Sequence, residues 1–189
     1  MYRKIENLKE VLENHLIYLE TGDLSKHADL SGANLSGMDL SDVDLRYADL
    51  SGSILRGTDL YSAKLNGALL NDAYLSGANL SFANLEGGFL NGAKLNGAKL
   101  NGANLLKASL NAADLCGALL DHTNLSFADL YNADLCNADL SGALLDHTNL
   151  SFAYLNGAKL NGAILNDVDL SRSYICDTDL SGAEGLNGK

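Results

Sequence analysis

Residues 93–105 read AKLNGAKLNGANL, in which leucine returns at every fifth position and follows an alanine two places earlier. This spacing runs through most of the chain. Every position divisible by five from Leu30 to Leu180 is leucine except Ile175, which gives 31 tandem repeats without an insertion or a deletion. A repeat this short and this regular decides the fold before any other feature of the sequence is considered.

A period of five residues is incompatible with a regular helix or a flat strand. In an α-helix, leucines five apart would step about 140° around the axis and would never line one face. In a strand, an odd spacing sends successive leucines to opposite sides. The leucines align only if the chain bends in the same direction every five residues, with each leucine inside. The sequence therefore predicts a solenoid.

The positions of the glycines and the absence of proline support this bend. Of the 19 glycines, 15 follow a repeat leucine by two residues, where a tight turn can use a positive φ. Proline is absent, as expected if every coil needs its backbone N–H groups for the ladder to the next coil.

The repeats resemble those of the pentapeptide repeat family, whose pattern is A-[DN]-L-x-x, as in Ala33-Asn34-Leu35 and Ala48-Asp49-Leu50. The resemblance covers residues 28–182 and implies an all-β solenoid, the right-handed quadrilateral β-helix, with four five-residue sides per coil. On that basis the repeats form about 7.75 coils and a rod roughly 37 Å long.

The two ends differ from the repeats. Residues 1–27 are predicted to form an N-terminal capping helix and a junction, because Ile5, Leu8, Leu12, Leu16 and Leu19 recur at helical spacing before Gly22. A partner-binding amphipathic helix is the alternative. Residues 183–189 form a short, glycine-rich tail with no helical pattern. An uncovered last coil invites end-to-end pairing, so we expect a homodimer through the C-terminal coils.

Composition excludes several functional classes. The net charge is −11 and the isoelectric point is near 4.5, so phosphate backbones and anionic lipid surfaces would repel the chain, and protein partners are expected instead. No apolar run is long enough to span a membrane, and the N-terminus lacks the pattern of a signal peptide. We expect a cytoplasmic protein.

Few residues suggest chemistry. Cys116, Cys136 and Cys176 fall in one column of the solenoid, where free thiols are favoured over a disulfide between the first two. His122 and His147 belong to a segment repeated after 25 residues, which places them on adjacent sides without a shared partner. We therefore expect no catalytic residues, no metal site, no cofactor and no enzymatic activity.

Two surfaces are candidates for protein contact. An acidic belt lies between the lysines at 107 and 159 and consists of Asp114, Asp121, Asp129, Asp134, Asp139 and Asp146. An apolar patch is formed by large side chains at outward positions: Phe127, Leu144, Phe152, Tyr154, Ile164 and Tyr174.

These features favour a non-enzymatic structural or protein-interaction rod, of which a regulator acting by direct protein contact is one form. Members of the family are abundant in cyanobacteria. The resemblance also implies an alternative, because some members are DNA mimics that bind DNA gyrase or topoisomerase IV and protect against quinolones. This chain differs from that group in lacking loop insertions and a C-terminal helix, and in its basic middle coils.

Overall fold

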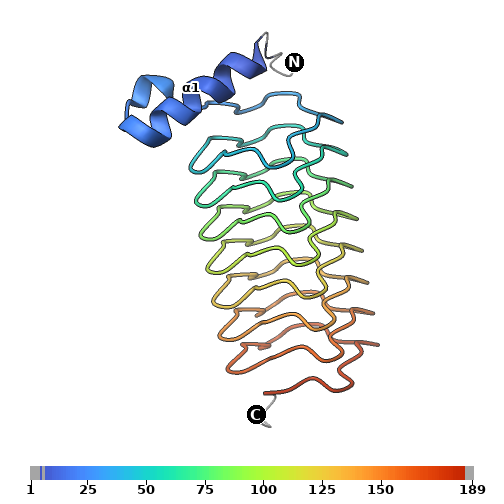
Figure 1. Cartoon of the computed structure of the whole chain (residues 1–189). Helices are drawn as coiled ribbons and strands as arrows, with labels where there is room; N and C mark the ends of the chain where they lie inside the picture. Colours follow the sequence, from blue (N-terminus) through green and yellow to red (C-terminus); the bar gives the residue numbers. More distant parts are fainter. Residues whose placement is uncertain (1–4, 6, 186–189) are drawn as a thin grey trace.

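The computed structural model describes residue 5 and residues 7–185, and it forms a rod of stacked four-sided coils with a helix across its N-terminal end (Figure 1). Helix α1 comprises Leu8–Thr21, and a short 3-10 helix, η1, comprises Leu24–Lys26. In residues 7–185 the coils pair through isolated parallel bridges between residues 20 apart, from Asp29↔Asp49 to Ile164↔Glu184. Each coil therefore takes 20 residues. Residues 186–189, most of the predicted C-terminal tail, lie outside the described residues.

The four sides of the rod are numbered here by their inward leucines. Face 1 contains Leu30 and every twentieth residue after it, face 2 starts with Leu35, face 3 with Leu40 and face 4 with Leu45. On each face, the residue before the leucine forms an outward column in which neighbours are bridged from coil to coil. Side chains 20 residues apart in sequence are therefore stacked along the rod.

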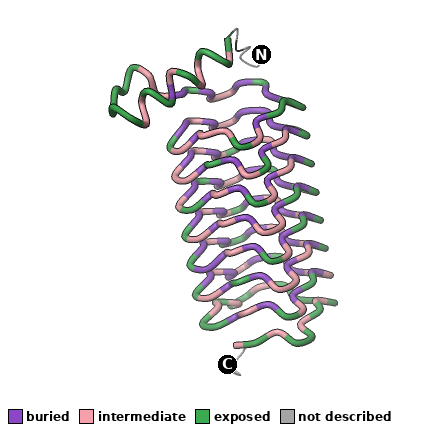
Figure 2. The backbone as a smooth tube through the Cα atoms, in the orientation of Figure 1, coloured by how far each residue is buried: buried purple, intermediate pink, exposed green. Residues whose placement is uncertain are grey.

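The core is a continuous column of aliphatic side chains. The repeat leucines from Leu30 to Leu165 are at most 4% exposed, and the small residues two places earlier are mostly buried beside them. Figure 2 shows this buried interior along the sides of the coils and exposed residues at the corners. The predicted inward spine of leucine is confirmed. Leu170, Ile175 and Leu180 in the last described coil are partly exposed.

Backbone hydrogen bonding explains why aspartate or asparagine precedes the leucine. In one repeat, the N–H groups of Leu115 and Gly117 donate to the next coil at 2.7 and 2.9 Å, and that of Asp114 donates to the preceding coil at 2.9 Å. The N–H of Ala118 closes the corner by donating to the carbonyl of Leu115 at 2.9 Å. Only the N–H of Cys116 is left, and it donates to the Asp114 carboxylate at 3.2 Å. The acidic or amide side chain thus satisfies the one donor that neither ladder nor turn uses.

The corners impose one backbone conformation on every repeat. The residue two places after the inward leucine of each repeat, or after Ile175, has positive φ from Gly32 to Gly182, and 16 of these 31 positions are not glycine. None of the 16 is β-branched, in agreement with the steric cost of such side chains in the left-handed region. The sequence pattern identified the turn from glycine, but the stacking of the coils holds the other residues in the same geometry.

Helix α1 covers the first coil. Its N-terminus is capped by Asn7, whose side chain accepts the Glu10 N–H at 3.2 Å, and it ends at Gly22 with a φ of +75°. Ile5, Leu8, Val11 and Leu12 pack against the leucine core. Contact with the core favours the cap over a free partner-binding helix. Leu16, expected on the same apolar side, is 47% exposed, because the helix extends past the edge of the rod (Figure 1).

A buried histidine fixes this helix to the rod. His15 is fully buried; its Nδ1 accepts the Ala28 N–H at 3.1 Å, and its Nε2–H donates to the Arg46 carbonyl at 3.1 Å. This pair of bonds requires the neutral ring with its proton on Nε2. Burial lowers the pKa of His15, and the nearby His27 acts in the same direction. The ring therefore joins the helix to the beginning and the end of the first coil in a single protonation state.

Candidate functional site

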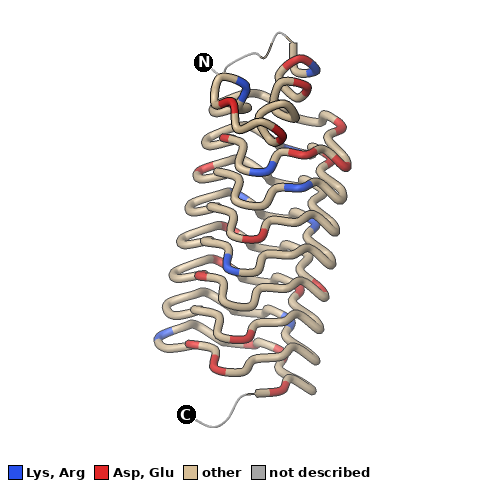
Figure 3. Tube along the Cα trace, turned by 60° about the vertical axis from the view of Figure 1, so that its left-hand side comes forward, with Lys and Arg blue, Asp and Glu red and all other residues tan. Residues whose placement is uncertain are grey.

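The predicted acidic belt encircles the rod and does not form one acidic face. Asp114 and Asp134 lie on face 2, Asp129 lies on face 1, Asp139 lies on face 3, and Asp121 and Asp146 follow the leucines of faces 3 and 4. Figure 3 shows acidic and basic residues scattered along the coils. A partner contacting one side of the rod would meet only part of the belt.

Four of the six belt carboxylates are held by a side chain of a neighbouring coil. Asp121 accepts from Asn101, Asp129 from Asn149 at 2.7 Å, Asp139 from Lys159 at 3.2 Å and Asp146 from Asn166 at 2.8 Å. The hydroxyl of Ser141 is the main cause of a lowered pKa at Asp139, and Lys159 contributes. These four carboxylates take part in the cohesion of the rod.

Asp114 and Asp134 are different. They are bridged neighbours on face 2, and each accepts the backbone N–H of the cysteine two residues later, at 3.2 and 3.0 Å. Within the described coils, no lysine or arginine forms an ion pair with either of them and no amide side chain donates to them. Face 2 thus presents two adjacent carboxylates that form no ion pair in the described coils, although Lys94 is bridged to Asp114 on the side away from Asp134.

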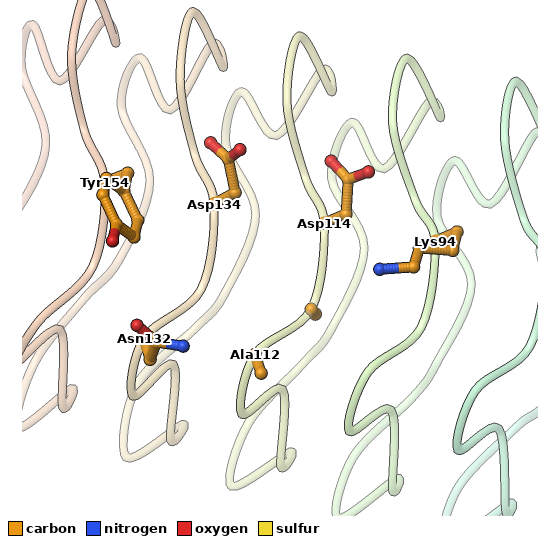
Figure 4. Close-up of a pocket in the computed structure, with 7 residues that line it drawn as sticks. Lys94, Ala112, Asp114, Asn132, Asp134 and Tyr154 are labelled. Carbon is orange, nitrogen blue, oxygen red and sulfur yellow. The ribbon is translucent and has the colours of Figure 1, made fainter.

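These carboxylates lie in a shallow hollow of about 280 Å³ (Figure 4). The hollow is lined by residues of three successive coils: Lys94, Ala112, Ala113, Asp114, Asn132, Asp134 and Tyr154. In Figure 4 the two carboxylates stand side by side between the Lys94 side chain and the Tyr154 ring. Both aspartates and the tyrosine were predicted as contact residues from the sequence, but Lys94, Ala112, Ala113 and Asn132 were not. The 20-residue column containing Lys94 and Asp114 was the available signal for the lysine.

The structure divides the predicted apolar patch into two groups. Tyr154 and Tyr174 stack on face 2 with ring centroids 4.8 Å apart and planes 4° apart, and Phe152 lies at the neighbouring corner, between faces 1 and 2. Leu144 and Ile164 are bridged on face 4, and Phe127 lies at the corner between faces 4 and 1. Face 1 separates the groups, so the six residues do not form one surface. The sequence predicts Leu144 and Ile164 on the side next to the tyrosines, and this placement is wrong because face 4 lies opposite face 2 of the four-sided coil.

Both corner phenylalanines have ring partners that the sequence analysis did not identify. The Phe127 ring stacks on His147 with centroids 4.8 Å apart. The Phe152 ring contacts Tyr131 at 5.4 Å and lies under the guanidinium of Arg172 at 5.3 Å. Aromatic side chains on the outside of this rod are thus packed against residues of neighbouring coils.

The cysteines and histidines do not assemble into a reactive site. All three cysteines are free thiols. Burial raises the pKa of the Cys116 and Cys136 thiols, and Asp134 also raises both, so neither thiol is activated as a nucleophile. His122 and His147 lie on different corners, and His147 is 3.7 Å from Asp167. No cluster of three potential metal ligands is found in the described residues.

The fold and its repeat identify the class of protein. The sequence profile of the family described as pentapeptide repeats matches residues 26–60, 53–92, 90–121, 123–162 and 153–184. The chain belongs to the pentapeptide repeat family, and its rod is the right-handed quadrilateral β-helix of that family.

Solved structures include several proteins similar to this chain. HetL of the cyanobacterium Nostoc sp. strain PCC 7120, a pentapeptide repeat protein involved in heterocyst differentiation regulation, is 32% identical over 92% of this chain and 96% of its own, with a TM-score of 0.33. Rfr23 of the cyanobacterium Cyanothece 51142 is 23% identical over 92% and 95%, with a TM-score of 0.31. QnrB1, a plasmid-mediated fluoroquinolone resistance protein, is 20% identical over 82% and 84%, with a TM-score of 0.44.

No curated protein shows significant similarity to this chain. Among the described residues, neither helix has the length and apolar character needed to cross a bilayer.

Proposed function

We propose that this protein is a non-enzymatic interaction rod that acts by direct contact with a partner protein in the cytoplasm. The observation that carries the proposal is the pair of stacked tyrosines, Tyr154 and Tyr174, which are 39% and 54% exposed on face 2 beside two unpaired carboxylates. Tyrosine is enriched among the residues that contribute most to protein–protein binding, and adjacent exposed apolar side chains mark interaction sites. The coil behind Tyr154 is fully packed, with Leu155 buried, so this part of the surface is preformed.

The form of the rod supports binding more than catalysis. Family members are in general structural or interaction proteins. The hollow on face 2 is shallow and has no histidine among its lining residues. Catalysis usually needs a site that excludes water and brings an acid, a base or a nucleophile together.

A pull-down from a cell lysate, analysed by mass spectrometry, tests the proposal. The wild-type rod is compared with a Tyr154→Ala/Tyr174→Ala variant. A Tyr61→Ala/Phe82→Ala variant is the matched control, because these two rings also contact each other, at 5.7 Å, on a different part of the rod. We expect a partner that is captured by the wild type and the control and lost with the face 2 variant. Equal recovery with all three proteins would contradict the proposed surface.

A second candidate function is binding to DNA gyrase or topoisomerase as a DNA mimic. The net charge of −11 on a narrow rod favours it, since such a rod is complementary to a basic groove. The engagement of four belt carboxylates by neighbouring side chains weakens it. A supercoiling assay with purified gyrase separates the two functions, because an interaction rod of another kind leaves the enzyme uninhibited at micromolar concentration.

We also propose that two copies associate through their C-terminal coils. Leu170, Ile175 and Leu180 are partly exposed in the last described coil, and Ile175 reaches 49%. Pairing of two such ends would bury these side chains. Light scattering at high protein concentration should give the mass of a dimer, and a strictly monomeric mass would disprove the association.

A further inference from the structure

We infer that the hollow on face 2 is an arginine-binding site, which takes the guanidinium of an arginine on an extended segment of a partner protein. This inference rests on the proposed function and names the chemistry by which the partner is recognised. Its components are the Asp114 and Asp134 carboxylates, the Tyr154 ring and the opening beside Ala112 and Asn132.

The first argument is that the two carboxylates of face 2 carry more negative charge than the rod neutralises there. Asp114 and Asp134 are directly bridged, and like charges at opposed positions of paired strands destabilise the pairing. On face 3, Lys159 is bridged to Asp139 and its ammonium nitrogen lies 3.2 Å from that carboxylate. On face 2, Lys94 is bridged to Asp114, but within the described coils no lysine or arginine forms an ion pair with either carboxylate, so both can accept a positive group from outside.

The second argument is geometric. Each carboxylate uses one oxygen, Oδ1, to accept the N–H of the cysteine two residues later, which fixes the group, and the two carboxylates stand side by side among the residues of the hollow (Figure 4). Bridged neighbours lie about 4.8 Å apart. A guanidinium presents several N–H donors in one plane and can bond both carboxylates at once, whereas an ammonium acts as a single point charge.

The third argument is the aromatic wall. Two other outward rings of the rod lie under its own arginines: Arg56 lies over Tyr74 at 5.4 Å and Arg172 over Phe152 at 5.3 Å. Within the described residues, no arginine or lysine is placed over the Tyr154 ring, which stacks on Tyr174 on its other side. A guanidinium bound to Asp134 would therefore lie next to an open aromatic face, where a cation is favoured.

Lys94 limits how the partner segment can lie. It is the next residue of the same column and closes the hollow opposite Tyr154. A second positive residue of the partner would be repelled there, and a carboxylate would be attracted. The site therefore favours an arginine with an acidic residue nearby in an extended segment, which runs along the rod with its acidic residue toward Lys94.

The test uses two end-blocked peptides, EGRGS and EGKGS, titrated into the full-length isotopically labelled protein and followed by the chemical shifts of its backbone amides. We expect EGRGS to bind saturably at millimolar concentration with its largest shifts at residues 114, 134 and 154, and at least fivefold more tightly than EGKGS. Equal affinity for both peptides would overturn the inference of an arginine site, as would shifts centred on another face.

Matched variants connect this binding to the site. Asp114→Asn/Asp134→Asn removes both charges but keeps the acceptor for the cysteine N–H groups, so the coils should fold as before. Asp39→Asn/Asp59→Asn makes the same change in charge at equivalent positions of face 3, where the carboxylates accept the N–H groups of Ser41 and Tyr61. The face 2 variant should bind EGRGS at least tenfold more weakly and the control within twofold of the wild type. Equal losses in both variants would overturn the inference.

The lysate pull-down distinguishes failure of this inference from failure of the proposed function. If Tyr154→Ala/Tyr174→Ala loses the partner and Asp114→Asn/Asp134→Asn retains it, the interaction rod stands and the arginine site is wrong. If the wild-type rod captures no partner, the proposed function itself fails. Loss of the same partner with both face 2 variants supports the site.

Discussion

Substitution of glycine at a corner tests how the coils are stacked. Gly97 and Gly102 have nearly the same backbone conformation, with φ of +63° and +64°. A methyl group on Gly97 would meet no atom within 4 Å, whereas a methyl group on Gly102 would lie 2.7 Å from the Phe82 ring of the preceding coil. The two alanine variants therefore share the backbone strain and differ only in this overlap.

The expected loss of stability follows from the less costly way of relieving the overlap between the new methyl group and the Phe82 ring. Backbone strain costs about 1 to 2 kcal/mol in each variant, partly offset by about 0.4 to 1 kcal/mol from the reduced freedom of the unfolded chain. In Gly102→Ala, the Phe82 ring is 60% exposed and can turn away, but it then gives up its edge contact with Tyr61. That contact is worth about 0.5 to 1.5 kcal/mol, so Gly102→Ala should lose this much more stability than Gly97→Ala.

Thermal unfolding by circular dichroism measures the difference. About 1 kcal/mol corresponds to a shift of roughly 2 to 4 °C in a domain of this size. A double-mutant cycle adds Phe82→Ala to each glycine variant. The extra loss in Gly102→Ala should disappear when the ring is absent, and Gly97→Ala should show no coupling. Equal shifts for the two single variants, or coupling at Gly97, would refute the account of ring packing at the corner.

Three further predictions concern buried polar groups. Because burial lowers the pKa of His15, its stabilising contribution is present above pH 6.5 and is lost as the pH falls below that value. Thermal unfolding at pH 7.5 and 5.5 should therefore show an N-terminal cap that is less stable in acid. A His15→Gln variant with the same acid sensitivity would disprove this assignment. Ser53→Ala should raise stability by about 1 kcal/mol in urea unfolding, because the Ser53 hydroxyl is buried without a partner, and a loss would contradict this. Thr123→Val should lower stability by about 0.5 to 1.5 kcal/mol in the same assay, because Oγ1 of Thr123 donates to the Leu100 carbonyl at 2.8 Å; an unchanged midpoint would show that this bond contributes nothing.

The sequence predicted the fold well because one side chain decides each repeat. A leucine every five residues can be buried only by a chain that turns at each repeat, so position in sequence directly gives position in the coil. The glycines predicted fewer turns than exist, since residues such as Phe82 and His122 adopt positive φ as well. Their conformation is imposed by hydrogen bonds to the adjacent coils, and no local pattern encodes it.

The candidate site could be predicted only in part. The column rule placed Tyr154 on Tyr174 and Asp114 beside Asp134, as the structure shows. It could not show which carboxylates are engaged, because engagement depends on the residue one coil away and on the direction in which its side chain lies. The corners of Phe127 and Phe152 follow from the 20-residue coil, but the contacts of their rings with His147 and Tyr131 depend on side-chain directions that the period does not specify.

The inter-coil hydrogen bonds also bear on the chemical ageing of the chain. Asparagine followed by glycine is the dipeptide most prone to deamidation, in which the glycine nitrogen attacks the asparagine side chain to form a succinimide. In pairs such as Asn91-Gly92 and Asn156-Gly157, that nitrogen donates its proton to the next coil at 2.9 Å, so it is held away from the attack. We expect these pairs to stay intact in the folded rod and to deamidate readily in denaturant, as measured by intact mass over weeks. Equal deamidation rates in the folded and denatured states would show that stacking gives no such protection. A slower rate in the folded state would make the inter-coil hydrogen bonds a determinant of the protein's lifetime.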